Sequence, residues 1–347
     1  MKRAIMVSPA FKGGNKNIGD YVQAVAAAQF MPSHDYVNRE ALDEYSGEET
    51  KVILNGWFMH HPEKFPPSPA IKPLLVSFHL NPEAAKTMLT PAAVEWLKAN
   101  GPVGCRDTNT LAILAAHGVD AYFSACLTLT LGRTFGQRGA EGRSGVCFVD
   151  PFYIFKKKDF RKGRMEMLRH PLLALKIYSK MRRQMLAARP LAYRIKRFFR
   201  IGAFLKAYLT LFTPELLANA EYFSHDVPET MFASEDEKME YARKLVERYS
   251  RARYVVTTRI HCALPCVGMK TPVVFVNPVW RDMADGRFGG LTDFFSLVDA
   301  TPEKLTPRFP VPSGRLDLDA VITPDETFQP YADALALRAT RFAHIES

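Results

Sequence analysis

The chain has 347 residues, of which 47% are hydrophobic and 24% charged, and its formal net charge is +10. This composition is typical of a folded globular protein and excludes a disordered or fibrous chain, and the length favours two domains. Every apolar run is shorter than the roughly 18 residues of a transmembrane helix, and the first residues lack the pattern of a secretory signal. We therefore expect a cytoplasmic protein.

The first part of the chain alternates strands and helices. A glycine-rich loop at 12–20 separates the first strand from the first helix, whose apolar residues fall on one face. Such alternation predicts a parallel sheet with helices on both faces. The predicted strands are 3–8, 51–55, 74–78, 103–105 and 121–124, and the predicted helices are 20–30, 91–99 and 108–116.

The same alternation starts again at a strand at 145–149. We predict two parallel-sheet domains, residues 1–135 and 136–328, followed by a C-terminal helix within 329–347. Ligands bind outside the carboxyl ends of parallel strands, so a cleft between the two domains is the expected site. The later predicted elements are a helix at 235–249, a strand at 254–258, a helix at 262–269, a strand at 272–276 and a helix at 330–344.

The positive charge is concentrated in residues 156–206, which hold 17 Lys and Arg against two acids, so the rest of the chain has a net charge of −5. Interleaved apolar residues predict two amphipathic helices that break at Pro190, inside a helical insertion at about 155–215. Basic amphipathic helices bind anionic membrane surfaces or phosphate-rich partners. The alternative is a solvated insertion packed on the main body. No nucleic-acid-binding motif accompanies the charge, so no nucleic acid is expected.

The five cysteines are odd in number and spread along the chain, which indicates reduced thiols rather than a disulfide framework. Cys262 and Cys266 share one face of the predicted helix. Two thiols without nearby His or Cys partners make a poor zinc site, so we expect small buried side chains and no metal site.

Arg259 and His261 follow the strand at 254–258 and come at the start of the next helix, with Pro265 expected in its first turns. The helix dipole and free N–H groups favour phosphate there. Arg259 adds a bidentate cation, and His261 can bind a phosphate oxygen or transfer a proton. The alternative is Arg259 in a surface ion pair and His261 as a helix cap.

The loop after the first strand is the second candidate site. Gly13 and Gly14 permit a ligand to approach the backbone closely. Asn17 can cap the following helix, and Asp20 can accept a proton from a sugar hydroxyl. The spacing matches neither the dinucleotide-binding nor the P-loop fingerprint. The alternative for Asp20 is an ordinary acid in the first turn of a helix.

Arg106 ends the strand at 103–105 just before a helix, which is again a place for an anion. Asp107 and Thr108 are expected to cap that helix.

Four blocks of sequence together resemble the polysaccharide pyruvyl transferase family. The resemblance covers most of the chain outside residues 150–220, and the basic insertion is not part of the family pattern. It implies a GT-B-like fold, in which two Rossmann-type parallel-sheet domains face a cleft. It also implies transfer of pyruvate from phosphoenolpyruvate to a pair of sugar hydroxyls, which forms a pyruvate ketal. The blocks are NIGDYVQ at 17–23, GCRDT at 104–108 with SACLTLTL at 124–131, VTTRIHCALPC at 256–266 and TPVVF at 271–275.

The resemblance implies that Arg106, Arg259 and His261 bind the donor and that the Gly-Asp loop corresponds to residues 19–20. On the chemistry of their side chains, we expect His261 to be a general acid or a phosphate clamp. Asp20 is expected to remove a hydroxyl proton, with Asn17 beside it as a second acceptor-binding residue. Arg287, in the loop at 285–290, is a further donor candidate whose alternative is plain solvent exposure. The reaction requires several fixed cations and no metal or cofactor.

Two rival functions remain. The first is a GT-B glycosyltransferase that uses a nucleotide sugar, which would have the same fold and a similar basic pocket. The second is a protein without catalytic activity that uses residues 156–206 to bind membrane lipid or a polyanion. The same segment gives the pyruvyl transferase reading a possible peripheral contact with the cytoplasmic face of an anionic membrane.

Overall fold

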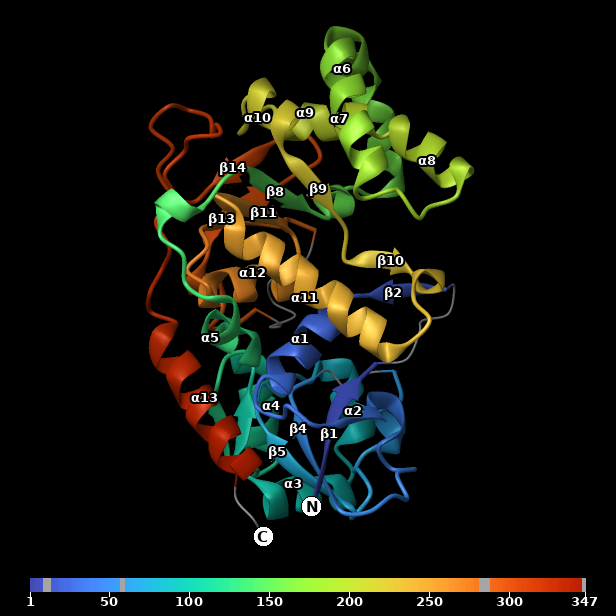
Figure 1. Cartoon of the computed structure of the whole chain (residues 1–347), viewed down its shortest axis with the longest axis vertical. Helices are drawn as coiled ribbons and strands as arrows, with labels where there is room; N and C mark the ends of the chain where they lie inside the picture. The colour runs from blue at the N-terminus through green and yellow to red at the C-terminus, as the bar shows by residue number, and fades with distance from the viewer. Residues whose placement is uncertain (9–13, 57–59, 281–287, 345–347) are drawn as a thin grey trace.

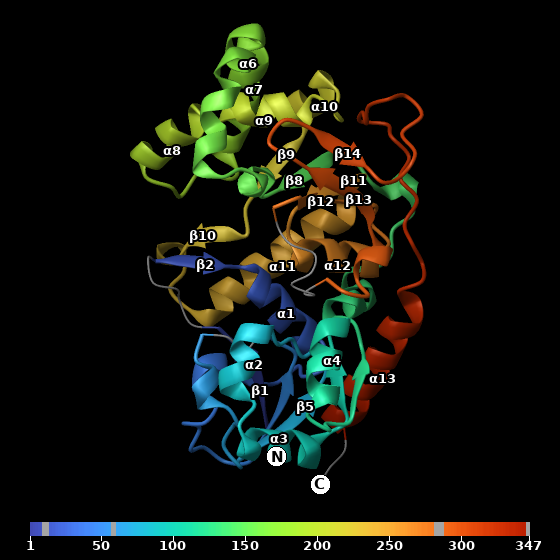
Figure 2. The same cartoon turned by 180° about the vertical axis from the view of Figure 1, so that it is seen from behind.

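The computed structural model describes residues 1–8, 14–56, 60–280 and 288–344 (Figures 1 and 2). The chain forms two largely parallel sheets with helices packed around them, which confirms the predicted α/β class. We call residues 1–135 the N-terminal half and residues 136–328 the C-terminal half. The helical insertion, residues 155–215, projects at the end of the molecule opposite the two termini (Figure 1).

The N-terminal half contains a parallel sheet in the order β3-β1-β4-β5. An isolated bridge between Phe78 and Cys105 continues this order to the parallel pair β6-β7. Ala4 pairs with Asp35 on one side and with Val52 on the other, so β1 lies between β3 and β4. The strands are β1 (Lys2–Val7), β3 (Asp35–Asn38), β4 (Thr50–Leu54), β5 (Ile71–Leu75), β6 (Val103–Cys105) and β7 (Ala121–Phe123).

The C-terminal half contains a sheet in the order β14-β13-β12-β11-β8-β9, parallel except for β14. In both sheets the first strand lies between the second and the third. This is the flavodoxin-like order of doubly wound sheets, so the Rossmann-type description holds for the class and not for the strand order. The strands are β8 (Val146–Val149), β9 (Glu221–Phe223), β11 (Tyr254–Thr257), β12 (Val273–Pro278), β13 (Ser296–Ala300) and β14 (Leu305–Pro307).

The predicted helices outside the insertion are confirmed to within a few residues, and their starts follow capping rules. The Thr90, Asp107 and Ser234 side chains each accept a hydrogen bond from a backbone N–H in the first turn of their helix. Asp107 is therefore a cap, as expected. The confirmed helices are α1 (Gly19–Ala28), α3 (Pro91–Asn100), α4 (Thr108–Ala116), α11 (Glu235–Arg251), α12 (Ile260–Gly268) and α13 (Gln329–His344). The short helices α2 (Pro82–Met88) and α5 (Gly132–Phe135) were not predicted.

The helical insertion contains more than the two predicted helices. The break at Pro190 is confirmed, because α8 starts directly after it. Buried residues of α7 and α9 pack with Phe148 and Tyr222 of the C-terminal sheet, so the insertion rests on the main body as one alternative expected. Its helices are α6 (Arg164–Arg169), α7 (Pro171–Arg183), α8 (Leu191–Phe198), α9 (Ile201–Tyr208) and α10 (Pro214–Asn219). Among the described residues, none of the helices has the length and apolar character needed to span a bilayer.

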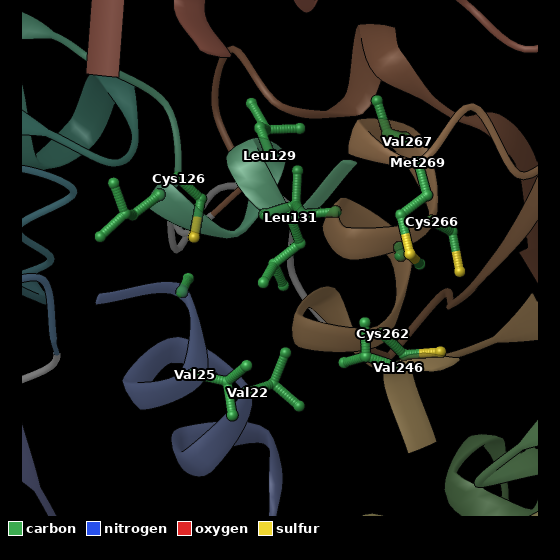
Figure 3. Packing of buried hydrophobic residues seen from close by; sticks show 14 of the residues in the cluster. Val22, Val25, Cys126, Leu129, Leu131, Val246, Cys262, Cys266, Val267 and Met269 are labelled. Atoms are coloured by element: carbon green, nitrogen blue, oxygen red, sulfur yellow. The ribbon is translucent and has the colours of Figure 1, made fainter. Parts of the chain in front are cut away.

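One hydrophobic core joins the two halves. Figure 3 shows Val22 and Val25 of α1 near Leu129 and Leu131, with Cys262 of α12 across from them. Every residue of α1 except Asp20 is buried, so burial extends beyond the one face on which its larger apolar residues were predicted. The reason is that α1 is covered by α11, α12 and the short 3-10 helix at Leu127–Leu131 at once.

The C-terminal helix α13 returns to the N-terminal half (Figures 1 and 2). Arg3 and Lys51 of the first sheet donate hydrogen bonds to its Ala343 and Phe342 carbonyls, at 3.2 and 2.9 Å. The chain thus crosses between the halves more than once. The shared core and the contacts of α13 together fix the position of one half relative to the other.

The close approach of α12 to residues 127–131 depends on Gly268. A Cβ atom at Gly268 would lie 2.2 Å from the carbonyl oxygen of Leu129, which is a severe clash with backbone. We predict that Gly268→Ala lowers the free energy of unfolding by roughly 1–3 kcal/mol or more, measured by urea denaturation. Gly139→Ala is the matched control, because a Cβ there has no atom within 4 Å. Equal stability of both variants would contradict this packing.

Candidate functional site

A cavity of about 250 Å³, the first cavity, lies where the two halves meet at the carboxyl ends of their strands. Its lining includes five of the six residues predicted to bind or react, and Gly14 of the glycine-rich loop is not part of it. Arg287 lies outside the described residues, although the next residue, Phe288, lines the cavity. The lining residues are Asn17, Gly19, Asp20 and Arg106 from the N-terminal half, and Tyr153, His225, Thr258, Arg259, Ile260, His261 and Phe288 from the C-terminal half.

Asp150 organises the C-terminal side of the cavity. It follows β8, next to β11, and its backbone is left-handed, with φ 52° and ψ 46°. Its carboxylate accepts hydrogen bonds from Arg259 Nε at 2.7 Å, from Ser224 Oγ at 2.5 Å and from the His225 backbone N–H at 3.0 Å. Asp150 therefore ties the ends of three adjacent strands together.

The pair between Asp150 and Arg259 is charged. Burial alone would raise the pKa of Asp150, but the nearby Arg259 and the hydrogen bonds that Asp150 accepts hold that pKa below its ordinary value. Burial likewise opposes the charge of Arg259, and Asp150 outweighs it, so the pKa of Arg259 is raised. The surface ion pair considered for Arg259 is wrong, because its partner carboxylate is only 9% exposed.

Arg259 directs its charge at the first cavity. Its guanidinium lies over the Tyr153 ring, with Cζ 4.6 Å from the ring centroid, and its Nε is held by Asp150. Within the described part of the chain, its two terminal nitrogens have no hydrogen-bond partner. A fork of two free N–H₂ groups on a fixed arm is suited to bidentate binding of carboxylate or phosphate.

His261 is the second residue of α12, which begins at Ile260 with Arg259 in the N-cap position. His261 is therefore not the cap that the alternative proposed. Pro265 is the sixth residue of the helix and so lies in its second turn, within the first turns where it was predicted. The side chain of His261 is only 8% exposed and lines the cavity together with Arg259.

The loop that precedes α1 contains a short strand, β2 (Asn15–Asn17), paired with β10 (Asp226–Pro228) of the C-terminal half. Asn17 accepts a hydrogen bond from the Gly19 N–H at 3.2 Å, although the N-cap position itself is Ile18. Asp20 accepts from Ser8 Oγ at 3.1 Å. Asn17 also lies beside it, with Nδ2 3.4 Å from Asp20 Oδ1. Gly13 lies outside the described residues.

Gly19 allows this loop to meet the two histidines of the other half. A Cβ atom there would lie 3.1 Å from Asn17 Oδ1, 3.1 Å from His225 Nδ1 and 3.3 Å from His261 Cβ. A side chain at this position would push Asp20 away from the histidines. Close packing against these residues therefore explains why a glycine precedes Asp20.

Arg106 supplies the cation of the N-terminal half. It lies between β6 and α4, is 3% exposed, and its backbone N–H donates to the Phe78 carbonyl at 2.8 Å. Asp107, next to it, caps α4, contacts His79 Nδ1 at 2.5 Å and pairs with Arg106 Nε at 3.7 Å. Arg106 and Arg259 both line the cavity, so the cavity has two guanidinium groups from different halves.

His225 and Asp150 are site residues that sequence reasoning missed. His225 Nε2 lies 3.0 Å from the Tyr249 hydroxyl, and its Nδ1 has no hydrogen-bond partner among the described residues. Burial lowers the pKa of His225 from 6.5 to about 4, with only partial compensation by Asp150, so the ring is neutral at pH 7. Asp150 directly follows β8, and His225 comes shortly after β9. This position after a strand is the signal that could have identified them.

The predicted burial of the cysteines is confirmed. All five are free and buried. Among the described residues, no group of three or more His, Cys, Asp and Glu side chains is arranged to hold a metal ion.

We predict that His225 makes stability depend on pH. Because the pKa of His225 is lower in the folded chain, the unfolded chain binds more protons between pH 6.5 and about 4, and acid destabilises the fold there. This effect amounts to at most about 3 kcal/mol. Urea denaturation of the wild type and His225→Gln at pH 7 and pH 4.5 measures it. The variant should lose less stability on acidification, and an equal loss would contradict the assignment.

A family model matches most of the chain. The family model described as polysaccharide pyruvyl transferase matches residues 17–278. No curated protein matches the chain.

Proposed function

The chain belongs to the polysaccharide pyruvyl transferase family, and on this basis we propose that it transfers pyruvate from phosphoenolpyruvate to two hydroxyls of a glycan or glycan precursor, forming a ketal. The observation that carries the proposal is the meeting of Arg106, Arg259 and His261 with Asp20 in one cavity. The two sheets would be the facing parts of a GT-B-like arrangement, with the donor between them.

Phosphoenolpyruvate has a carboxylate and a phosphate, and the cavity has matching cations. In our proposal the terminal nitrogens of Arg259 bind one anionic group and Arg106 binds the other. The N-terminus of α12, a nine-residue helix, adds a favourable dipole beside His261. The volume of about 250 Å³ suits a three-carbon donor rather than a whole nucleotide sugar.

The proposed reaction balances without a redox cofactor. A proton adds to the methylene carbon of phosphoenolpyruvate, and one sugar oxygen bonds to the central carbon and loses its proton. The second sugar oxygen then bonds to the same carbon as the bond from carbon to the phosphate oxygen breaks. Of the two hydroxyl protons released, one returns to the group that protonated the methylene carbon. The other leaves with inorganic phosphate. His261 protonates the donor or holds its phosphate, and Asp20 takes a hydroxyl proton.

Ligand-dependent stability separates this proposal from a nucleotide-sugar glycosyltransferase. We expect phosphoenolpyruvate, at a concentration well above its Kd, to raise the Tm of the protein by a few degrees. UDP-glucose should leave the Tm unchanged. Stabilisation by UDP-glucose alone would contradict the proposal.

Arg259 gives the sharpest test of the donor site. We predict that Arg259→Gln lowers kcat/KM for phosphoenolpyruvate about 100-fold or more, because a charge-assisted bidentate contact is lost. Release of inorganic phosphate measures the rate. Arg251→Gln is the control, because Arg251 is an exposed arginine that pairs with Glu247 on α11. The donor assignment would be wrong if both variants kept the wild-type rate.

A peripheral contact with the cytoplasmic face of an anionic membrane belongs to the same proposal. Seven of the thirteen large apolar side chains that are exposed among the described residues belong to α6, α7, α8 and the residue after α8. Exposed Lys176, Arg182 and Lys196 lie among them. Apolar and cationic side chains alternating on one segment fit an anionic lipid surface. The seven are Met165, Leu168, Leu172, Leu175, Leu191, Ile195 and Phe199.

We predict that the double variant Leu168→Glu and Leu172→Glu reduces co-sedimentation with phosphatidylglycerol-containing vesicles at least tenfold. These side chains are 73% and 81% exposed, so folding should be unaffected. Val321→Glu is the control, at a 93% exposed position outside the insertion. Wild-type binding should also weaken with salt. Loss of binding by the control alone, or absence of binding by the wild type, would refute the contact.

A further inference from the structure

A second cavity, of about 420 Å³, adjoins the first where the helical insertion meets the carboxyl end of the C-terminal sheet. Arg259 and Tyr153 line both cavities. The second cavity is also lined by Lys156, Arg197 and Arg200 of the insertion, none of which lines the first. The insertion therefore builds a compartment that opens beside the proposed donor site.

The cations of the second cavity are held by aromatic rings. Arg197 Cζ lies 4.3 Å from the centroid of Phe152, and Arg200 Cζ lies 4.1 Å from that of Phe160. Ring faces orient a guanidinium without neutralising its charge. Lys156 Nζ is placed in the same way, 5.2 Å from the centroid of Trp280.

These cations lack the carboxylate partners that surface cations usually find. Among the described residues, Lys156, Arg197 and Arg200 have no carboxylate within ion-pair distance. The two acids that line the cavity are engaged elsewhere, Asp150 by Arg259 and Asp226 by Arg189 at 3.2 Å. Burial lowers the pKa of Arg200, and repulsion by Arg197 lowers it further. The cavity thus has an excess of positive charge.

The chemistry of the walls indicates what fits inside. Flat aromatic faces pack against the C–H faces of sugar rings, and arginines without carboxylate partners bind phosphate oxygens. We propose that the second cavity binds a sugar phosphate, with the phosphate at Arg197 and Arg200 and the sugar ring toward Tyr153. This inference rests on the proposed function for the identity of that ligand as the acceptor.

The shared residues explain how such an acceptor would reach the donor. Asp150 holds Arg259 Nε, so the guanidinium has one fixed position at the boundary of the two cavities. A sugar whose phosphate is anchored in the second cavity presents its hydroxyls at this boundary. The acceptor is then a glycan precursor that has a phosphate close to the sugar that receives pyruvate, and a neutral finished polysaccharide would be a poor substrate.

The test is calorimetric titration of the full chain, saturated with phosphoenolpyruvate, with glucose 1-phosphate, methyl glucoside and inorganic phosphate. We expect glucose 1-phosphate to bind at least tenfold more tightly than either of the others. The double variant Arg197→Gln and Arg200→Gln should weaken its binding at least 30-fold. Arg183→Gln, at an exposed arginine on α7 outside the cavity, should bind like the wild type.

Equal binding of inorganic phosphate and glucose 1-phosphate would reduce the cavity to a general anion site and overturn the inference, as would unchanged binding by the double variant. If the double variant does not fold, Lys156→Gln, at an exposed position, should still weaken binding several-fold, and unchanged binding would refute the site. The Tm shift with phosphoenolpyruvate separates the two proposals. If that shift persists without sugar phosphate binding, only this inference fails. If it is absent while sugar phosphate binds, the proposed function fails.

Discussion

The charge pair between Asp150 and Arg259 is the interaction on which the site depends. The Asp150 carboxylate is almost fully buried at the junction of β8 and β11, and burial opposes the charge of both groups, so each is stabilised by the presence of the other. Loss of one partner from such a pair costs about 3–5 kcal/mol, because the remaining charge is left buried and uncompensated. Asp150 accepts a hydrogen bond only from Nε of Arg259, so the two terminal nitrogens are available to bind an anion. Asp150 in addition fixes the His225 backbone, so one carboxylate positions both a cation and a neutral imidazole.

The N-terminal half reaches this pair through packing and backbone pairing. The β2–β10 ladder and the hydrogen bond from the Ile18 N–H to the His225 carbonyl, at 2.8 Å, bring Asp20 to the C-terminal half. Burial of α1 on all sides supplies the apolar free energy that holds the loop there. The return of α13 to the first sheet adds contacts far from the cavity. The distance between Asp20 and Arg259 is therefore determined by this backbone pairing and packing.

The sequence predicts those site residues whose position has a physical signature. Arg106 and Arg259 lie between a buried strand and a helix, and His261 is the second residue of its helix. Asn17 precedes the first helix and Asp20 is in its first turn, after a glycine-rich loop. Parallel sheets gather such positions at one edge, so their meeting was predictable even though their partners were not. Asp150 and His225 have the same kind of position, but a 3-10 helix follows one and a three-residue antiparallel strand the other, and neither has helical periodicity. Short strands such as β3 and β9 were missed for the same reason, and the aromatic support of Arg197 and Arg200 is tertiary and has no local signal.

The central claim is that Arg106 and Arg259 hold phosphoenolpyruvate between the two halves. The most direct measurement is an experimental structure of the protein crystallised with phosphoenolpyruvate. We expect the donor in the first cavity, with one anionic group within hydrogen-bond distance of the terminal nitrogens of Arg259 and the other near Arg106. Phosphoenolpyruvate bound elsewhere, with both arginines making no contact to it, would contradict the account.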